Sequence, residues 1–108
     1  MGATIKDLFS YNSINSVNYG DSVVFFKIGA DWCIPCNELE KVLNSIPNSI
    51  IYHISIDNME FESFFMDNQV TSVPYTIIKY QNATTRFKGI RTKEQILELI
   101  DFLKMSVA

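Results

Sequence analysis

Residues 28–37 read Ile-Gly-Ala-Asp-Trp-Cys-Ile-Pro-Cys-Asn and hold the only two cysteines of the chain, Cys33 and Cys36, directly after its only tryptophan, Trp32. A largely apolar run leads into this stretch, and apolar side chains at helical spacing follow it. The cysteines therefore lie where a buried strand turns into a helix. The first turn of a helix has unpaired backbone N–H groups and a partial positive charge, which favour an anion such as a thiolate. We predict that Cys33 is the more acidic and more exposed thiol, and that Cys36 is the more sheltered one.

Length and composition narrow the class of protein. The 108 residues have the length of one ordinary domain, so we take 1–108 as a single domain. A net charge of −3 gives no basic surface for nucleic acid. No apolar run approaches the length that spans a bilayer, and the first residues lack the apolar core of a signal peptide. We expect a soluble, cytoplasmic protein that binds neither nucleic acid nor membrane.

Hydrophobic spacing predicts alternating strands and helices along the rest of the chain. Strands are expected at residues 22–28, 50–56, 72–80 and 84–88, and helices at 33–46, at 58–68 and from Thr92 onward. Residues 4–9 fit either a short edge strand or a helical turn, and residues 10–20 fit a weak helix. The order is β-α-β-α-β-α-β-β-α, with a parallel first half and a final hairpin. It predicts an α/β fold whose mixed central β-sheet is flanked by helices on both faces.

The stretch Trp32-Cys33-Ile34-Pro35-Cys36, placed after a buried strand, resembles the active site of the thioredoxin family. The order of elements is similar to the thioredoxin fold along nearly the whole chain. Further marks are Pro74 at the place of the family's cis-proline, Asp57 at the end of a strand, and Gly89 in the substrate groove. The resemblance implies a dithiol–disulfide oxidoreductase. Because the dithiol itself is the redox centre, no bound cofactor is expected.

The resemblance also implies a mechanism and partners. The Cys33 thiolate attacks a client disulfide and forms a mixed disulfide, and Cys36 then attacks that bond and releases the reduced client. The expected activity is that of a general protein disulfide reductase. Its expected partners are disulfide-containing client proteins and an NADPH-dependent thioredoxin reductase, and the protein is expected to be a monomer.

In this family the client lies as an extended strand in a groove beside the cysteines. The corresponding groove residues here are mostly apolar: Trp32, Ile34, Pro35, Val73, Pro74, Gly89 and Ile90. By the same analogy the backbone N–H and C=O of Val73 would pair with the client strand. A groove built on backbone groups and apolar side chains predicts many weakly selected clients.

One departure from the family concerns the proton of Cys36. Lys27 stands where thioredoxins keep a buried Asp, and His53 stands where they often have a Lys on the neighbouring strand. Lys27 could extend to solvent while His53 fills space. Alternatively, one of the two takes the proton of Cys36 or tunes the cysteine pKa, because a buried Lys has a lowered pKa and His titrates near neutrality.

Other interpretations of the cysteine pair stay open from the sequence. Structural zinc takes four ligands, and Cys33, Cys36 and His53 supply only three, so we expect no metal. A disulfide oxidase or isomerase of an oxidising compartment would carry a similar motif, as would a glutathione-dependent protein. A binding subunit could also keep the motif with incidental redox activity. Asp57 is expected to cap the helix that follows it.

Overall fold

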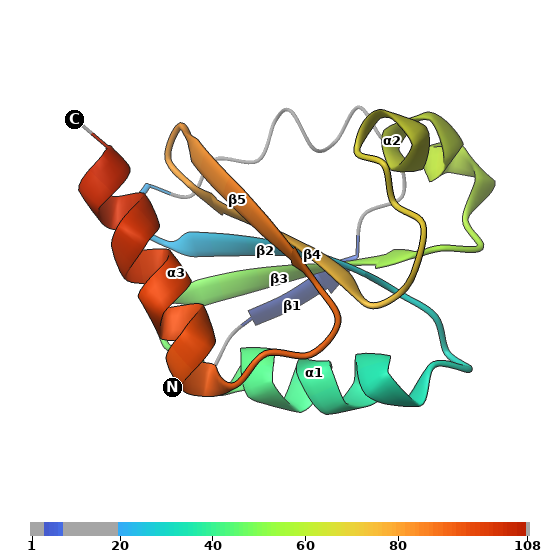
Figure 1. Ribbon diagram of the computed structural model, residues 1–108, viewed down its shortest axis with the longest axis horizontal. Coiled ribbons are helices and arrows are strands. Elements are labelled where there is room, and N and C mark those ends of the chain that lie inside the picture. Colours follow the sequence, from blue (N-terminus) through green and yellow to red (C-terminus); the bar gives the residue numbers. More distant parts are fainter. Residues whose placement is uncertain (1–3, 8–19, 108) are drawn as a thin grey trace.

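The computed structural model describes residues 4–7 and 20–107, the former by their backbone alone (Figure 1). The elements are β1 (Thr4–Asp7), β2 (Val23–Gly29), α1 (Ile34–Asn44), β3 (Ser49–Ser55), the 3-10 helix η2 (Met59–Phe61), α2 (Glu62–Asp67), β4 (Tyr75–Tyr80), β5 (Ala83–Lys88) and α3 (Lys93–Ser106). The strand alternative is thus the correct one for residues 4–7. The helix predicted for residues 10–20 lies almost entirely outside the described residues.

Within the described residues the strands form one five-stranded sheet in the order β1-β3-β2-β4-β5. β3 pairs in parallel with β1 and β2, whereas β4 pairs antiparallel with β2 and β5. All seven residues of β2 are buried, as expected for a central strand covered on both faces. The predicted α/β fold with a mixed sheet is therefore confirmed.

Two hydrophobic cores lie on opposite faces of the sheet. Phe25 of β2 belongs to the core that buries Leu39 of α1 and Ile96 of α3. The next residue, Phe26, belongs to the core that buries Phe61 and Phe64 of the η2–α2 segment. This alternation follows from the two-residue period of a strand. Figure 1 shows the resulting layers, with α1 and α2 on opposite sides of the sheet. Within the described residues no helix is long and apolar enough to cross a membrane.

The helix predicted for residues 58–68 is divided into η2 and α2, and its cap differs from the prediction. The side chain of Asn58 accepts a hydrogen bond from the backbone N–H of Glu60 at 3.0 Å and caps η2. Asp57 is therefore not the cap, and its carboxylate accepts a hydrogen bond from Trp32 instead. Both residues are good N-caps, so the sequence alone did not decide between them.

The strand predicted for residues 72–80 begins later, at Tyr75. Pro74 stands directly before this strand and has no N–H to donate to a ladder. The Val73–Pro74 peptide bond is cis, as the resemblance implied. The shorter strand leaves residues 70–74 as a loop beyond the edge of β4, close to the start of α1.

Thr92 closes the first turn of α3 through a reciprocal pair of hydrogen bonds. Its hydroxyl accepts from the backbone N–H of Gln95 at 3.1 Å, and the Gln95 side chain accepts from the backbone N–H of Thr92 at 3.0 Å. We expect Thr92→Ala to lower the free energy of unfolding by about 1 kcal/mol. Urea denaturation measures this change. Thr92→Ser keeps the hydroxyl and should retain most of the stability; equal losses in both variants would contradict the capping role.

Candidate active site

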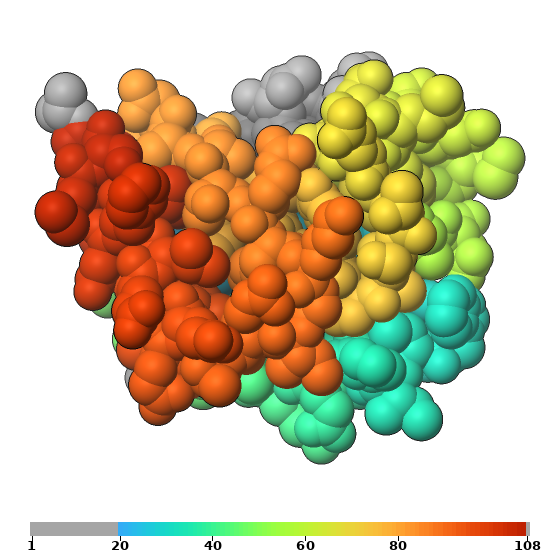
Figure 2. Space-filling view, in the orientation of Figure 1, coloured from blue at the N-terminus to red at the C-terminus, as the bar shows by residue number. Residues whose placement is uncertain are grey.

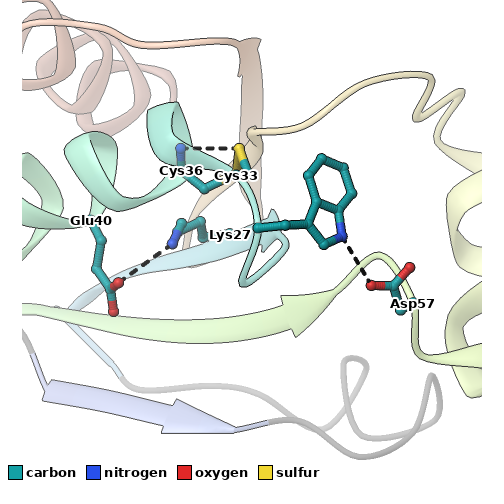
Figure 3. Close-up of a disulfide and its surroundings, with 6 residues drawn as sticks. Lys27, Cys33, Cys36, Glu40 and Asp57 are labelled. Atoms are coloured by element: carbon teal, nitrogen blue, oxygen red, sulfur yellow. Dashed lines mark hydrogen bonds and ion pairs between the residues drawn. A yellow bond between two sulfur atoms is a disulfide. The ribbon is translucent and has the colours of Figure 1, made fainter.

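The two cysteines lie at the start of α1, just beyond the carboxyl end of β2 (Figure 3). Cys33 and Cys36 form a disulfide, with their Cα atoms 5.2 Å apart. Cys33 is the N-cap of α1, and its sulfur accepts a hydrogen bond from the backbone N–H of Cys36 at 3.2 Å. Pro35 occupies the first turn, where its missing N–H costs nothing. In the reduced protein the same N–H and the helix terminus would stabilise a thiolate on Cys33.

Both cysteines are buried, and their exposure follows the predicted order. The exposed fraction is 5% for Cys33 and 1% for Cys36. They form a small cluster with Ala30, against which Val73 and Ile56 pack. Cys33 is thus the cysteine nearer the surface, and Cys36 is the more enclosed one.

An apolar rim surrounds the buried sulfurs. The exposed fraction is 69% for Trp32 and 73% for Ile34, and Ile90 is also exposed. Large exposed apolar side chains grouped around a reactive centre are typical of a surface that binds a partner. Figure 2 shows one outer face of the molecule, with the turquoise segment that contains the start of α1 beside the gold segment before β4.

The second side of the rim comes from the loops before β4 and after β5. Pro74 is buried, and its carbonyl accepts a hydrogen bond from the N–H of Gly89 at 2.9 Å. Gly89 has a φ of +74°, a conformation that favours glycine, and it presents Ile90 next in the chain. Val73 links the two sides because it packs on the cysteine cluster. These contacts bring Val73, Pro74 and Gly89 to the side of the cysteines; that they bind a client stays a prediction.

A cleft of about 560 Å³ opens on the Trp32 side of the cysteines. Its lining residues are Trp32, Ile56, Asp57, Val70, Thr71, Ser72 and Val73. The indole N–H of Trp32 donates a hydrogen bond to Oδ2 of Asp57 at 3.4 Å (Figure 3). The sequence did not identify Val70, Thr71 and Ser72 as site residues. They form no recognisable motif, and only the fold brings them to the same cleft as Trp32.

Lys27 lies behind the disulfide, and its burial is the least expected feature of the site. Its exposed fraction is 0%, so the interpretation in which it extends to solvent is wrong. Its Nζ lies 3.7 Å from Oε2 of Glu40 on α1 and makes no hydrogen bond within the described residues (Figure 3). Burial lowers the pKa of Lys27 below its ordinary value of 10.5, and the Glu40 carboxylate opposes this effect.

Three other residues define the surroundings of Lys27. A Cβ atom on Gly29 would lie 3.3 Å from Sγ of Cys36 and 3.5 Å from Cε of Lys27, so both side chains border the same point. His53 is the register partner of Lys27 on β3 and is partly exposed. Sequence reasoning missed Glu40, although its place four residues after Cys36 puts both on one face of a helix.

The comparisons with known proteins agree with this geometry. The family model for thioredoxin matches residues 7–102. The chain belongs to the thioredoxin family. Together with the disulfide-bonded Cys33–Cys36 pair, this membership makes the protein a thiol–disulfide oxidoreductase that acts on disulfide-containing substrates.

Solved thioredoxin structures share the fold at low sequence identity. The thioredoxin of Trypanosoma brucei brucei has a TM-score of 0.75 at 19% identity, covering 96% of this chain and 95% of its own. A mutant form of the thioredoxin of Halobacterium salinarum has a TM-score of 0.75 at 21% identity, covering 93% and 90%. Chloroplastic thioredoxin z has a TM-score of 0.73 at 19% identity, covering 97% and 98%. No curated protein is similar enough in sequence to match the chain. At these identities the structural likeness establishes the thioredoxin fold.

Residues 20–107 contain no group of three or more His, Cys, Asp and Glu side chains that could hold a metal ion. In this thioredoxin-family protein both sulfurs are bonded to each other rather than directed at a shared ligand. Family membership and the disulfide together identify the pair as a redox-active centre.

Gly29 leaves the space that the inner cysteine needs. Because a Cβ at this position would lie 3.3 Å from Sγ and 3.4 Å from Cβ of Cys36, a larger residue must displace the sulfur. We expect Gly29→Val to lower the free energy of unfolding of the oxidised protein by about 1–3 kcal/mol. Guanidinium denaturation measures the loss, and Gly29→Ala should give a smaller one. A fully stable valine variant would contradict the tight contact.

Proposed function

We propose that the protein is a general protein disulfide reductase of the thioredoxin type. The observation that carries this proposal is the position of Cys33: its sulfur caps α1, accepts the N–H of Cys36 and borders an exposed apolar rim. A helix terminus lowers the pKa of a thiol and so raises its thiolate fraction at neutral pH. A thiolate beside an apolar rim is suited to attack a disulfide in a loosely bound protein chain.

The reaction follows from the two sulfurs. In the reduced protein the Cys33 thiolate attacks one sulfur of the client disulfide, and the other client sulfur leaves as a thiolate. Cys36 then attacks the Cys33 sulfur, which forms the observed disulfide and releases the second client thiolate. Two electrons have passed from the dithiol to the client. The short reach between Cys33 and Cys36 makes the second step intramolecular and therefore fast.

The loop before β4 suits a client held by its backbone. Among the described residues, no backbone–backbone hydrogen bond involves the N–H or C=O of Val73. Val73 also packs on the cysteine cluster, so a strand paired with its backbone would pass directly over Cys33. Backbone pairing gives affinity without reading the client sequence. We therefore propose that clients are numerous and weakly selected.

We also propose that the protein works as a cytoplasmic monomer and receives its electrons from an NADPH-dependent thioredoxin reductase. Family analogy supports the reductase, and the open rim around Trp32 and Ile34 gives such an enzyme access to the disulfide. The electron source is tested by following the oxidation of NADPH in a mixture of a thioredoxin reductase, this protein and insulin. NADPH should be oxidised only when all three are present. Sedimentation velocity tests the monomer.

The proposed direction of electron flow is tested by two linked measurements. The protein should accelerate the reduction of insulin by dithiothreitol. The midpoint potential of its Cys33–Cys36 couple, measured against glutathione, should be about −270 mV, the value of thioredoxin. A midpoint potential of about −120 mV would instead indicate a disulfide oxidase. Absence of any acceleration would overturn the reductase proposal.

A further inference from the structure

We propose that Lys27 is the group that takes the proton of Cys36 when Cys36 resolves the mixed disulfide, and that Glu40 positions the Lys27 amine and passes the proton to solvent. This inference rests on the proposed function, because it describes the second step of that reaction. It replaces the buried carboxylate of the thioredoxin family by a lysine that has its own carboxylate partner.

The geometry places Lys27 beside the sulfur of Cys36. Cε of Lys27 and Sγ of Cys36 lie within 3.5 Å of the same point, the Cβ position that Gly29 leaves empty. Lys27 reaches this point from the central strand β2, and Cys36 reaches it from the first turn of α1. Figure 3 shows the Lys27 amine directed at Glu40, with Cys33 and Cys36 at the start of the helix that carries Glu40. The Lys27 side chain and the Cys36 sulfur therefore border one position, so a rotation of the flexible lysine side chain would bring its amine toward the thiol.

The surroundings of Lys27 disfavour a permanently charged amine. An ammonium has three N–H donors, and the Nζ of Lys27 is fully buried with no hydrogen-bond partner among the described residues. The register partner on β4, Thr76, is also fully buried, and its hydroxyl has no hydrogen-bond partner in the part of the chain that the structure describes. A neutral amine tolerates this setting better and offers a lone pair to a thiol. The lowered pKa of Lys27 has the same origin.

Glu40 connects this buried amine to solvent. Its Oε2 lies 3.7 Å from Nζ of Lys27, and its side chain is 31% exposed. At this distance the carboxylate attracts an ammonium without a direct hydrogen bond. It therefore stabilises Lys27 after protonation and can carry the proton outward with a small movement of two flexible side chains.

Among the side chains that the structure describes, few titratable groups are placed near Lys27. From α1 these are Glu40 and Cys36, and from β3 there is His53, the register partner of Lys27. The β4 partner, Thr76, does not titrate in the working range of pH. His53 is therefore the alternative base that an experiment has to separate from Lys27.

Resolution of the mixed disulfide begins with a proton transfer. The Cys36 thiol gives its proton to the neutral Nζ of Lys27, and the resulting thiolate attacks the Cys33 sulfur. The Cys33–Cys36 bond forms, the bond between Cys33 and the client breaks, and the client sulfur leaves with the electron pair. The Lys27 ammonium then loses its proton through Glu40 to solvent, and the client thiolate is protonated from solvent.

The test separates resolution from the first attack. The reduced protein is mixed rapidly with a peptide that contains one disulfide, quenched with acid at intervals, and analysed by mass spectrometry from pH 5.5 to 9. Lys27→Met removes the base, and Lys27→Arg places a permanently charged group there that cannot act as a base. Glu40→Gln is matched by Glu38→Gln, two residues away on α1, whose carboxylate pairs with the exposed Lys41. His53→Gln tests the alternative base.

We expect both Lys27 variants to form the mixed disulfide normally and to resolve it about 100-fold more slowly, so that it accumulates. In Glu40→Gln the pH at which resolution becomes fast should fall, because the carboxylate no longer raises the pKa of Lys27. Glu38→Gln and His53→Gln should match the natural protein. Normal resolution in Lys27→Met or Lys27→Arg overturns the inference, as does a pH dependence that disappears in His53→Gln.

These outcomes differ from a failure of the proposed function. If the natural protein forms no mixed disulfide at all, the reductase proposal fails before Lys27 is tested. The shift in Glu40→Gln keeps the inference falsifiable even if a Lys27 variant does not fold, because Glu40 lies partly exposed on the helix surface.

Discussion

Replacement of Cys33 by serine is expected to lower the rate of insulin reduction by roughly 1,000-fold or more, because the nucleophile of the reaction is lost. Cys36 cannot take its place. It is 1% exposed and lies inside the helix rather than at the cap, so a client disulfide cannot reach it. The rate is measured by the precipitation of the reduced insulin chain in the presence of dithiothreitol.

Cys36→Ser is the matched control for this experiment. It keeps the attacking sulfur at the start of α1 and removes only the resolving one, so it should still bond to the client and then stall. A Cys33→Ser variant with more than a tenth of the natural activity would contradict the assignment of the nucleophile.

The second large effect is on stability: replacing Lys27 should slow resolution of the mixed disulfide but stabilise the fold. Lys27→Met is expected to raise the free energy of unfolding by about 1–4 kcal/mol at neutral pH, because an apolar side chain of similar length replaces a buried amine with no hydrogen-bond partner in residues 20–107. Urea denaturation of the oxidised protein measures the gain. Lys41→Met changes an exposed lysine on α1 and should alter stability by less than about 0.5 kcal/mol.

The gain from Lys27→Met should depend on pH in a definite direction. Burial lowers the pKa of Lys27 in the folded protein, whereas the unfolded chain keeps the ordinary value of 10.5. Between these two values the unfolded chain binds more protons, so the stability of the natural protein rises with pH there. The difference in free energy of unfolding between Lys27→Met and the natural protein is therefore largest below the pKa of Lys27 in the folded protein. It decreases as the pH rises toward 10.5. A constant difference across this range would contradict the lowered pKa.

Local patterns were enough to predict most of the fold and the centre of the site. The apolar run of β2 and the helical spacing of α1 placed Cys33 and Cys36 at a strand–helix junction, and the structure has them there. These features depend on neighbours in the sequence, which a single chain displays. The resemblance added the cis bond before Pro74, which no local pattern specifies.

Features that depend on distant contacts were predicted less well. The sequence left the direction of Lys27 open, since a lysine on a central strand can reach solvent unless a helix covers it, and α1 does cover it. Glu40 belongs to no motif in the sequence, and its ion pair with Lys27 exists only in the fold. The role of Asp57 as the acceptor for Trp32 also required the fold, because 25 residues separate the two along the chain.

Trapping the covalent intermediate tests the two-sulfur mechanism itself. Cys36→Ser is incubated with a protein that contains one disulfide, digested without reductant and sequenced by mass spectrometry. We predict that the client is joined through a disulfide to Cys33, and that dithiothreitol releases it. An adduct that forms equally well on Cys33→Ser, or no adduct on either variant, would contradict the two-sulfur mechanism.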